Sequence, residues 1–167
     1  MSSEPPEITI CDAQSGAEIE LVRALMRDYG ASLDVDLSFQ DFEAELAALP
    51  GAYASPEGAL VMALVNGLPA GCCALRPINE VDYPNACEMK RLYVSPVFRG
   101  FGLGRMMVER ILSIGRAEGY THMLLDTLDE MEAARALYRD TGFEEVDAYY
   151  YNPLPGTRYL AAKLQAS

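Results

Sequence analysis

Leu92-Tyr93-Val94-Ser95-Pro96-Val97-Phe98-Arg99-Gly100-Phe101-Gly102-Leu103-Gly104-Arg105 is the stretch of this sequence that decides its fold. It begins on an apolar strand, turns through glycines and opens a helix. Glycine lets the backbone approach a ligand closely, and the first N–H groups of a helix lack partners and carry about half a positive charge. The stretch therefore predicts an anion site suited to a pyrophosphate, with Arg99 and Arg105 at its edges. A tight strand-to-helix turn without a ligand is the alternative.

Two other phosphate-binding motifs do not fit these glycines. A P-loop needs Gly-Lys-Ser/Thr, which does not follow here. The dinucleotide fingerprint G-x-G-x-x-G needs a third glycine where the chain has Arg105 or Met107. Asp126 does stand at the end of the next predicted strand, where a ribose-binding acid would lie. A Rossmann-like nucleotide binder therefore stays open as an alternative.

Apolar periodicity on both sides of this stretch predicts the remaining elements. The predicted strands are Glu7–Cys11, Ala59–Val65, Ala70–Leu75, Cys87–Val94, Thr121–Thr127, Phe143–Val146 and Tyr159–Leu164, and the predicted helices are Ala17–Tyr29, a segment through Phe42, Leu46 and Leu49 to Pro50-Gly51, Gly102–Glu118 and Glu130–Asp140. Gly30 is expected to stop the first helix, Ser38 to cap the second, and Asn66-Gly67-Leu68-Pro69 to form a hairpin turn. The order β-α-α-β-β-β-α-β-α-β-β indicates an α/β (α+β) fold with an antiparallel meander and a β-α-β crossover, rather than a doubly wound sheet.

Length and composition restrict the class of protein. The 167 residues predict a single domain, 5–165, and a content of 50% hydrophobic and 23% charged residues is typical of globular proteins. No apolar run approaches the ~20 residues of a membrane span, and the first ten residues lack the features of a secretory signal. We therefore expect a cytoplasmic protein without membrane contact.

The net charge and the spacing of the cysteines restrict the ligands and binding sites that this chain is expected to have. A net charge of −12 disfavours nucleic-acid binding, which needs basic patches, and favours a cationic substrate such as an amine, although it can also serve solubility alone. Cys11, Cys72, Cys73 and Cys87 lack C-x-x-C spacing and are expected to be reduced, buried side chains. With His122 as the one histidine of the sequence, no metal site is expected.

Two motifs of this chain occur together, in the same order and spacing, in one known family. Arg99, Gly102 and Gly104 fit the pattern Arg/Gln-x-x-Gly-x-Gly/Ala at the start of a helix, and Ala134-Arg135-Ala136-Leu137-Tyr138-Arg139-Asp140-Thr141-Gly142-Phe143 fits A-x-x-L-Y-x-x-x-G-F. Over Cys87–Phe143 the chain thus resembles the GNAT superfamily of acyltransferases. The predicted order of elements extends the likeness to most of the domain.

The resemblance implies a mixed, mostly antiparallel central sheet of six to seven strands with about four helices. Two central parallel strands, Met89–Val94 and Met123–Thr127, are expected to splay apart, so that the pantetheine arm of acetyl-CoA lies between them. A backbone N–H near Val94 would face the thioester oxygen. The implied cofactor-binding residues are Leu92, Tyr93, Val94, Arg99, Gly100, Phe101, Gly102, Leu103, Gly104, Arg105, Ala134 and Tyr138. The chain departs from the family at Met131, where members often carry an asparagine that contacts the cofactor.

Acyl transfer from a thioester to an amine needs a proton acceptor for the amine and a proton donor for the leaving thiolate. Tyr138 stands where the family places a tyrosine beside the cofactor sulfur, and we expect it to be the acid, although its ring can also simply pack. Glu88, on an otherwise apolar strand, is the expected base, with an ion pair to a neighbouring Lys or Arg as the alternative. Strand alternation places Glu88, Lys90, Leu92 and Val94 on one face and Met89, Arg91 and Tyr93 on the other.

The segment Tyr149-Tyr150-Tyr151-Asn152-Pro153-Leu154-Pro155-Gly156-Thr157 is rich in tyrosine. Tyr149 and Tyr150 are expected to bind substrate, because rings with hydroxyls suit an amine or a small polar ligand. Covering a sheet edge or forming a dimer contact is the alternative, and a homodimer is the commonest assembly of such chains. Arg76 is expected to bind a substrate carboxylate bidentately, or else to be a solvated surface group.

These features together predict an N-acetyltransferase that moves the acetyl group of acetyl-CoA to a primary amine. The acceptor is expected to be a small molecule or an amino-acid-like amine, or a peptide N-terminus, which attacks directly while the backbone stabilises the oxyanion. Two alternatives stay open. One is a non-catalytic CoA-binding sensor, which the departure at Met131 supports, and the other is the nucleotide binder.

Overall fold

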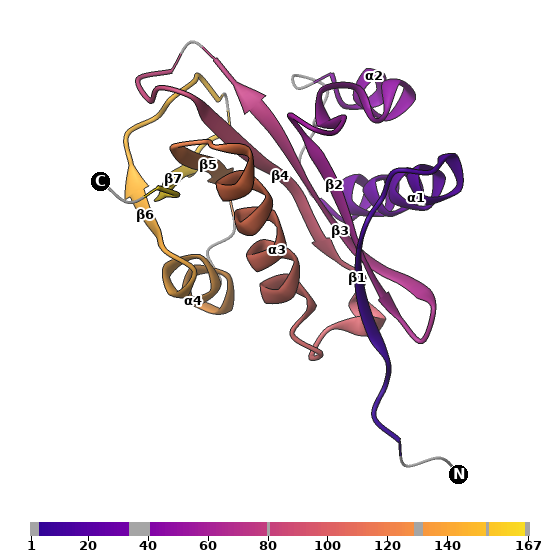
Figure 1. Cartoon of the computed structure of the whole chain (residues 1–167). Coiled ribbons are helices and arrows are strands. Elements are labelled where there is room, and N and C mark those ends of the chain that lie inside the picture. Colours follow the sequence, from indigo (N-terminus) through magenta and orange to yellow (C-terminus); the bar gives the residue numbers. More distant parts are fainter. Residues whose placement is uncertain (1–3, 34–40, 80, 129–131, 153, 166–167) are drawn as a thin grey trace.

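The computed structural model, which describes residues 4–33, 41–79, 81–128, 132–152 and 154–165, contains a seven-stranded sheet with helices on both faces (Figure 1). The strands are β1 (Ile8–Asp12), β2 (Ala59–Val65), β3 (Leu68–Ile78), β4 (Ala86–Val94), β5 (His122–Thr127), β6 (Phe143–Val146) and β7 (Arg158–Lys163). They lie in the order β1-β2-β3-β4-β5-β7-β6. Among the described pairs, β4 and β5 are parallel and the others are antiparallel. This confirms the predicted class and order of elements, and it is not the doubly wound parallel sheet of a Rossmann-like binder.

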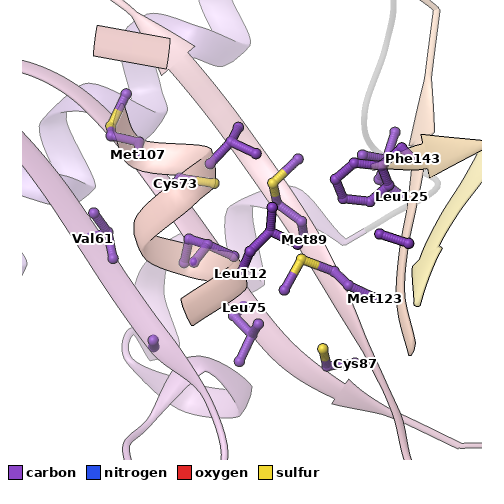
Figure 2. Close-up of a cluster of buried hydrophobic side chains, with 14 of the residues drawn as sticks. Val61, Cys73, Leu75, Cys87, Met89, Met107, Leu112, Met123, Leu125 and Phe143 are labelled. Carbon is purple, nitrogen blue, oxygen red and sulfur yellow. The ribbon is translucent and has the colours of Figure 1, made fainter. Parts of the chain in front are cut away.

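The helices of the described residues are α1 (Gly16–Ser32), α2 (Phe42–Ala48), α3 (Leu103–Glu118) and α4 (Glu132–Asp140). α3 and α4 lie on one face of the sheet, and α1 and α2 lie on the other (Figure 1). On the first face, Met107 of α3 belongs to a buried cluster with Met89 and Met123 of the central strands (Figure 2). On the second face, Met26 of α1 and Leu46 of α2 are fully buried in a separate cluster.

Neighbouring strand residues point into these two cores in turn. Cys73 lies in the cluster under α3, and Cys72 lies in the cluster under α1 and α2. The cysteines are free thiols, and burial raises the pKa of Cys72 to about 12.

Among the described residues, the helices do not combine the length and the apolarity that crossing a bilayer requires.

The first helix does not stop at Gly30, as the sequence led us to expect. α1 continues to Ser32, and this glycine lies inside the helix against α2, where a Cβ would approach Cε2 of Phe42 to 2.7 Å. The glycine therefore permits close packing of two helices instead of ending one. The second helix is also shorter than predicted, since it ends at Ala48, and its described N-cap is Asp41. The predicted cap, Ser38, lies outside the described residues.

The hairpin between β2 and β3 is tighter than the predicted four-residue turn. Asn66 and Gly67 both have positive φ, 50° and 80°, and Val65 already pairs with Leu68. Two consecutive residues of positive φ form the turn that matches the twist of antiparallel strands. β3 therefore begins at Leu68, two residues before the predicted start.

β4 contains a bulge at Arg91 that reverses the predicted alternation of its side chains. The pairing with β3 steps from Ala74↔Lys90 to Cys72↔Tyr93, and Arg91 has φ +60°. One extra residue shifts the two-residue period, so residues beyond it exchange faces. The predicted grouping of Glu88 and Lys90 with Leu92 and Val94 is therefore wrong: Leu92 and Val94 pack with Met89 on the α3 face, and Tyr93 packs on the α1 face.

The two central parallel strands separate after a short paired stretch. β4 and β5 pair only from Ala86↔His122 to Glu88↔Leu124. Beyond these residues β4 follows β3 as far as Val94, and β5 follows β7 as far as Thr127. This confirms the expected splay, and it leaves the facing edges of both strands without each other as hydrogen-bond partners.

Candidate active site

The glycine-rich stretch forms the N-terminal end of α3, as predicted, and we call this end the mouth of α3. Gly100 and Gly102 adopt positive φ, 97° and 76°, which glycine reaches without strain. Gly102 is the N-cap, and the first backbone bond into the helix runs from the N–H of Met106 to its carbonyl at 3.2 Å. Three backbone N–H groups at this helix end have no partner among the described residues, those of Leu103, Gly104 and Arg105. The helix end can therefore bind an anion.

Both sequence motifs meet at this helix end. A Cβ on Gly104 would lie 3.5 Å from Leu137 of α4, an ordinary contact distance. Nη2 of Arg105 lies 3.2 Å from Oδ2 of Asp140, so part of its charge is used to join α3 to α4. Arg99 is exposed, and its guanidinium is accessible to solvent. The glycine turn, both predicted arginines and α4 thus surround one candidate anion site.

α4 carries the predicted acid. Tyr138 is half-buried, packs on the core under α3 and meets the ring of Phe143 edge-on at 5.9 Å between centroids. Ala134 is also half-buried, one turn earlier on the helix. Nε of Arg135, between them, is a buried nitrogen without a hydrogen-bond partner among the described residues. The role of Tyr138 stays a prediction, and Met131 lies outside the described residues.

A second hollow lies on the opposite face of the sheet, beside α2. We call it the polar cleft; its volume is about 760 Å³. Its lining comes from α2, β3, β4 and the tyrosine segment. The polar side chains in that lining are Asp41, Glu45, Tyr53, Arg76, Asn79, Glu88, Lys90, Tyr149, Tyr150 and Tyr151. The cleft thus gathers four of the predicted site residues, from positions far apart in the sequence: Arg76, Glu88, Tyr149 and Tyr150.

Glu88 is at the centre of a hydrogen-bonded group in this cleft. Its side chain is 1% exposed; Oε1 accepts from Nε of Arg76 at 2.8 Å, and Oε2 accepts from the hydroxyl of Tyr149 at 2.6 Å. Burial opposes the charge of Arg76, but Glu88 outweighs it and raises the pKa of that guanidinium. Burial and the charge of Glu88 also raise the pKa of Tyr149. Glu88 therefore forms the ion pair that the sequence left open as the alternative to a base.

Tyr150 is held in a similar way by Asp126. Its hydroxyl donates to Oδ2 of Asp126 at 2.6 Å, and Nδ2 of Asn152 approaches the same oxygen at 3.2 Å. Burial, with this hydrogen bond, raises the pKa of Tyr150. The rings of Tyr149, Tyr150 and Tyr159 contact one another at 5.3 to 5.7 Å between centroids. Both predicted substrate tyrosines are thus fixed in place by carboxylates of the central strands.

Sequence reasoning missed the group that joins α2 to the bulge. Arg91 donates to both oxygens of Glu45, at 2.9 and 3.1 Å, and its guanidinium carbon lies 4.9 Å from the ring centroid of Phe42. Lys90 lines the cleft beside them, and burial lowers its pKa despite the attraction of Glu88. Two adjacent basic residues on a strand whose other residues are mostly apolar are a signal that these side chains need partners.

The described residues bring together no group of three or more His, Cys, Asp or Glu side chains that could hold a metal ion. Most of the predicted site residues lie at two features, the candidate anion site at the mouth of α3 and the polar cleft beside α2. The splayed part of β4 lies between them, because its side chains contribute to the cores on both faces.

Comparison with known proteins gives consistent matches. The sequence model of the acetyltransferase (GNAT) family matches residues 20–143. An uncharacterized N-acetyltransferase of Schizosaccharomyces pombe is 35% identical over 96% of this chain and 98% of its own length. An acetyltransferase structure from Streptococcus agalactiae superposes with a TM-score of 0.73 at 23% identity, over 94% of this chain and 98% of that one. The protein yncA of Salmonella typhimurium, solved with its cofactor acetyl-CoA, superposes with a TM-score of 0.69 at 17% identity. This match covers 96% of this chain and 95% of that one.

Proposed function

Because this chain belongs to the GNAT family of acetyltransferases, we propose that it moves the acetyl group of acetyl-CoA to the primary amine of a small, amino-acid-like molecule. The observation that carries this proposal is the juxtaposition of the glycine-rich N-terminus of α3 with the polar cleft, on the two sides of one splayed strand pair. The first suits the phosphates of a donor. The second suits an acceptor.

The donor is proposed to bind along β4 and the mouth of α3. Free N–H groups at a helix N-terminus favour a pyrophosphate, and the unpaired edge of β4 beyond Glu88 can pair with the amides of a pantetheine arm. That a relative of the same fold was solved with acetyl-CoA is consistent with this assignment. The residues proposed to contact the donor are Leu92, Tyr93, Val94, Arg99, Gly100, Phe101, Gly102, Leu103, Gly104, Arg105, Ala134 and Tyr138.

The acceptor is proposed to enter from the cleft and attack the acetyl carbonyl carbon directly. The new C–N bond forms, a backbone N–H near Val94 stabilises the oxyanion, and the C–S bond then breaks. Tyr138 gives its proton to the leaving thiolate and regains one from solvent. The products are the N-acetylated amine and free CoA. Arg76, Tyr149 and Tyr150 are proposed to hold the acceptor during the attack.

The proton that the amine loses is proposed to reach Glu88 through Tyr149. Glu88 is almost without solvent contact, so a substrate has no direct access to its oxygens. The hydroxyl of Tyr149, which donates to Glu88 at 2.6 Å, can accept a proton from the amine while passing its own to the carboxylate. In this proposal Glu88 is still the base, but it receives the proton through the hydroxyl of Tyr149 and not directly from the amine.

Release of free thiol from acetyl-CoA, measured across a panel of primary amines, tests this function. We expect turnover with at least one small amine, and a Tyr149→Phe variant that retains its fold but loses about 100-fold in kcat, as removal of a proton-transfer group does. Tyr151→Phe is the matched control, because Tyr151 lines the same cleft but is 84% exposed. Acetyl-CoA binding without turnover on any amine would instead identify a CoA-binding sensor.

A further inference from the structure

Two carboxylates that line the polar cleft, the half-buried Glu45 and the buried Glu88, already have hydrogen-bond partners. Glu45 receives two hydrogen bonds from Arg91, and Glu88 receives bonds from Arg76 and Tyr149. A carboxylate that is paired in this way has little capacity left for a second cation. The cleft therefore does not attract a polycationic acceptor through these acids, although the chain as a whole carries a net charge of −12.

Arg76, in contrast, keeps hydrogen-bond donors for a ligand. A guanidinium has five N–H groups in a planar fork. Nε and Nη2 of Arg76 are both directed at the same oxygen of Glu88, at 2.8 and 2.7 Å. No further partner of Arg76 is found among the described residues, and its side chain, 36% exposed, lines the cleft. Its remaining N–H groups are therefore available to an acceptor of hydrogen bonds in the cleft.

The pairing of the strands fixes where this fork lies. Arg76 of β3 is opposite Glu88 of β4, two residues from Ala74↔Lys90, so Arg76, Glu88 and Lys90 share one face of the sheet before the bulge. Lys90 adds a second basic group to the same lining. Glu88 anchors Arg76 on one side and Tyr149 on the other. A ligand that contacts both Arg76 and the hydroxyl of Tyr149 is thus held on both sides of one buried carboxylate.

We infer that the acceptor is an amine that also carries a carboxylate, as amino acids do, and that Arg76 binds this carboxylate while the amine lies at Tyr149. A planar guanidinium matches a carboxylate through two parallel N–H bonds, which lysine cannot reproduce. The inference rests on the proposed acetyl transfer and names its substrate class. Arg76 is here a specificity-determining residue, and Glu88 positions it.

Matched pairs of acceptors that differ only in the carboxylate test this inference. The pairs are L-phenylalanine with phenethylamine, L-lysine with cadaverine, and β-alanine with ethylamine, each assayed by release of free CoA thiol. We expect kcat/KM to be at least about 10-fold higher for the acid of the best pair. In Arg76→Lys, which keeps the charge beside Glu88, this preference should fall about 10-fold through KM, with acetyl-CoA affinity unchanged.

The control is Arg110→Lys. Arg110 also pairs with a carboxylate, Asp12, through Nε and Nη2 at 3.1 and 2.6 Å, but it lies on α3 away from the polar cleft. The Arg110→Lys variant should leave the preference for carboxylate-bearing acceptors unaltered. Equal or better turnover of the carboxylate-free amines would overturn the inference and leave the proposed acetyl transfer standing. Failure of all amines of both kinds would refute both.

Discussion

Replacing Glu45 with glutamine should destabilise this protein much more than the same kind of change at an exposed ion pair. Glu45 and Arg91 form two hydrogen bonds, and their side chains are 20% and 3% exposed. Burial alone would lower the pKa of Arg91, but the hydrogen bonds and the charge of Glu45 raise it, so the guanidinium stays charged. Glutamine has nearly the same shape as Glu45 but leaves this buried cation without its counter-charge.

The size of the effect follows from the burial of the pair. Breaking a fully buried ion pair costs about 3–5 kcal/mol. Because Glu45 keeps some solvent contact and glutamine retains one acceptor oxygen, we expect about 2 kcal/mol. For a domain of this size that corresponds to a decrease in Tm of about 4–8 °C. Urea unfolding followed by circular dichroism measures the free energy, with an unchanged slope as the sign of an intact two-state transition.

Two further variants make the measurement specific. Asp12→Asn breaks the pair with Arg110, whose side chains are 36% and 43% exposed, and should cost less than about 1 kcal/mol. The double variant Glu45→Leu with Arg91→Met should recover most of the loss, since an apolar pair carries no desolvation cost. If Glu45→Gln were no less stable than Asp12→Asn, the view that this pair holds α2 to the bulge of β4 would be refuted.

Three other predictions follow from the packing and the proposed chemistry. Tyr138→Phe should lower kcat about 100-fold and leave the Kd of acetyl-CoA within about 2-fold; unchanged kcat would remove Tyr138 as the acid. Gly71→Ala should cost about 1–3 kcal/mol in urea unfolding, because its Cβ would lie 2.6 Å from the carbonyl oxygen of Tyr93, whereas Gly16→Ala, with nothing within 4 Å, should be neutral. Since the native state keeps the Cys72 thiol protonated, with a pKa of about 12, its contribution to stability should be complete below pH ~9 and be lost as the pH rises toward 12. Cys72→Ala should flatten that alkaline decline, and an unaltered slope would contradict the assignment.

The elements of this fold could be predicted because local pattern and tertiary context agree. The strand Ala59–Val65 was predicted to the residue, since its continuous apolar run lies between two other strands in a part of the sheet that is covered on both faces. The start of α3 was predicted from Gly102, whose positive φ the turn requires. At Gly30 and at the bulge of β4, the prediction was wrong where distant segments of the chain meet. Gly30 looked like a helix stop, but it lies inside α1, where the absence of a Cβ makes room for Phe42.

The bulge of β4 shows why parts of the candidate site could not be predicted from local sequence patterns. Alternation holds from Glu88 to Lys90 and fails after Arg91, and no local feature of the sequence marks the extra residue. Its partner, Glu45, is 46 positions away, so periodicity has no means of finding the pair. Likewise, sequence could propose Glu88 and Tyr149 separately, but their hydrogen bond depends on folding a distant loop over the central strands.

The most direct test of the central assignment is the Kd of CoA for Gly104→Asp, measured by calorimetry. A Cβ at this position meets only Leu137 within 4 Å, at an ordinary contact distance of 3.5 Å. An acid in the first turn stabilises a helix, so the fold should remain intact. It would place a negative charge where the pyrophosphate is proposed to bind. We predict CoA affinity reduced at least about 100-fold, with acetyl-pantetheine, which lacks the pyrophosphate, bound as well as by the wild type. Undiminished CoA affinity in this variant would contradict the account.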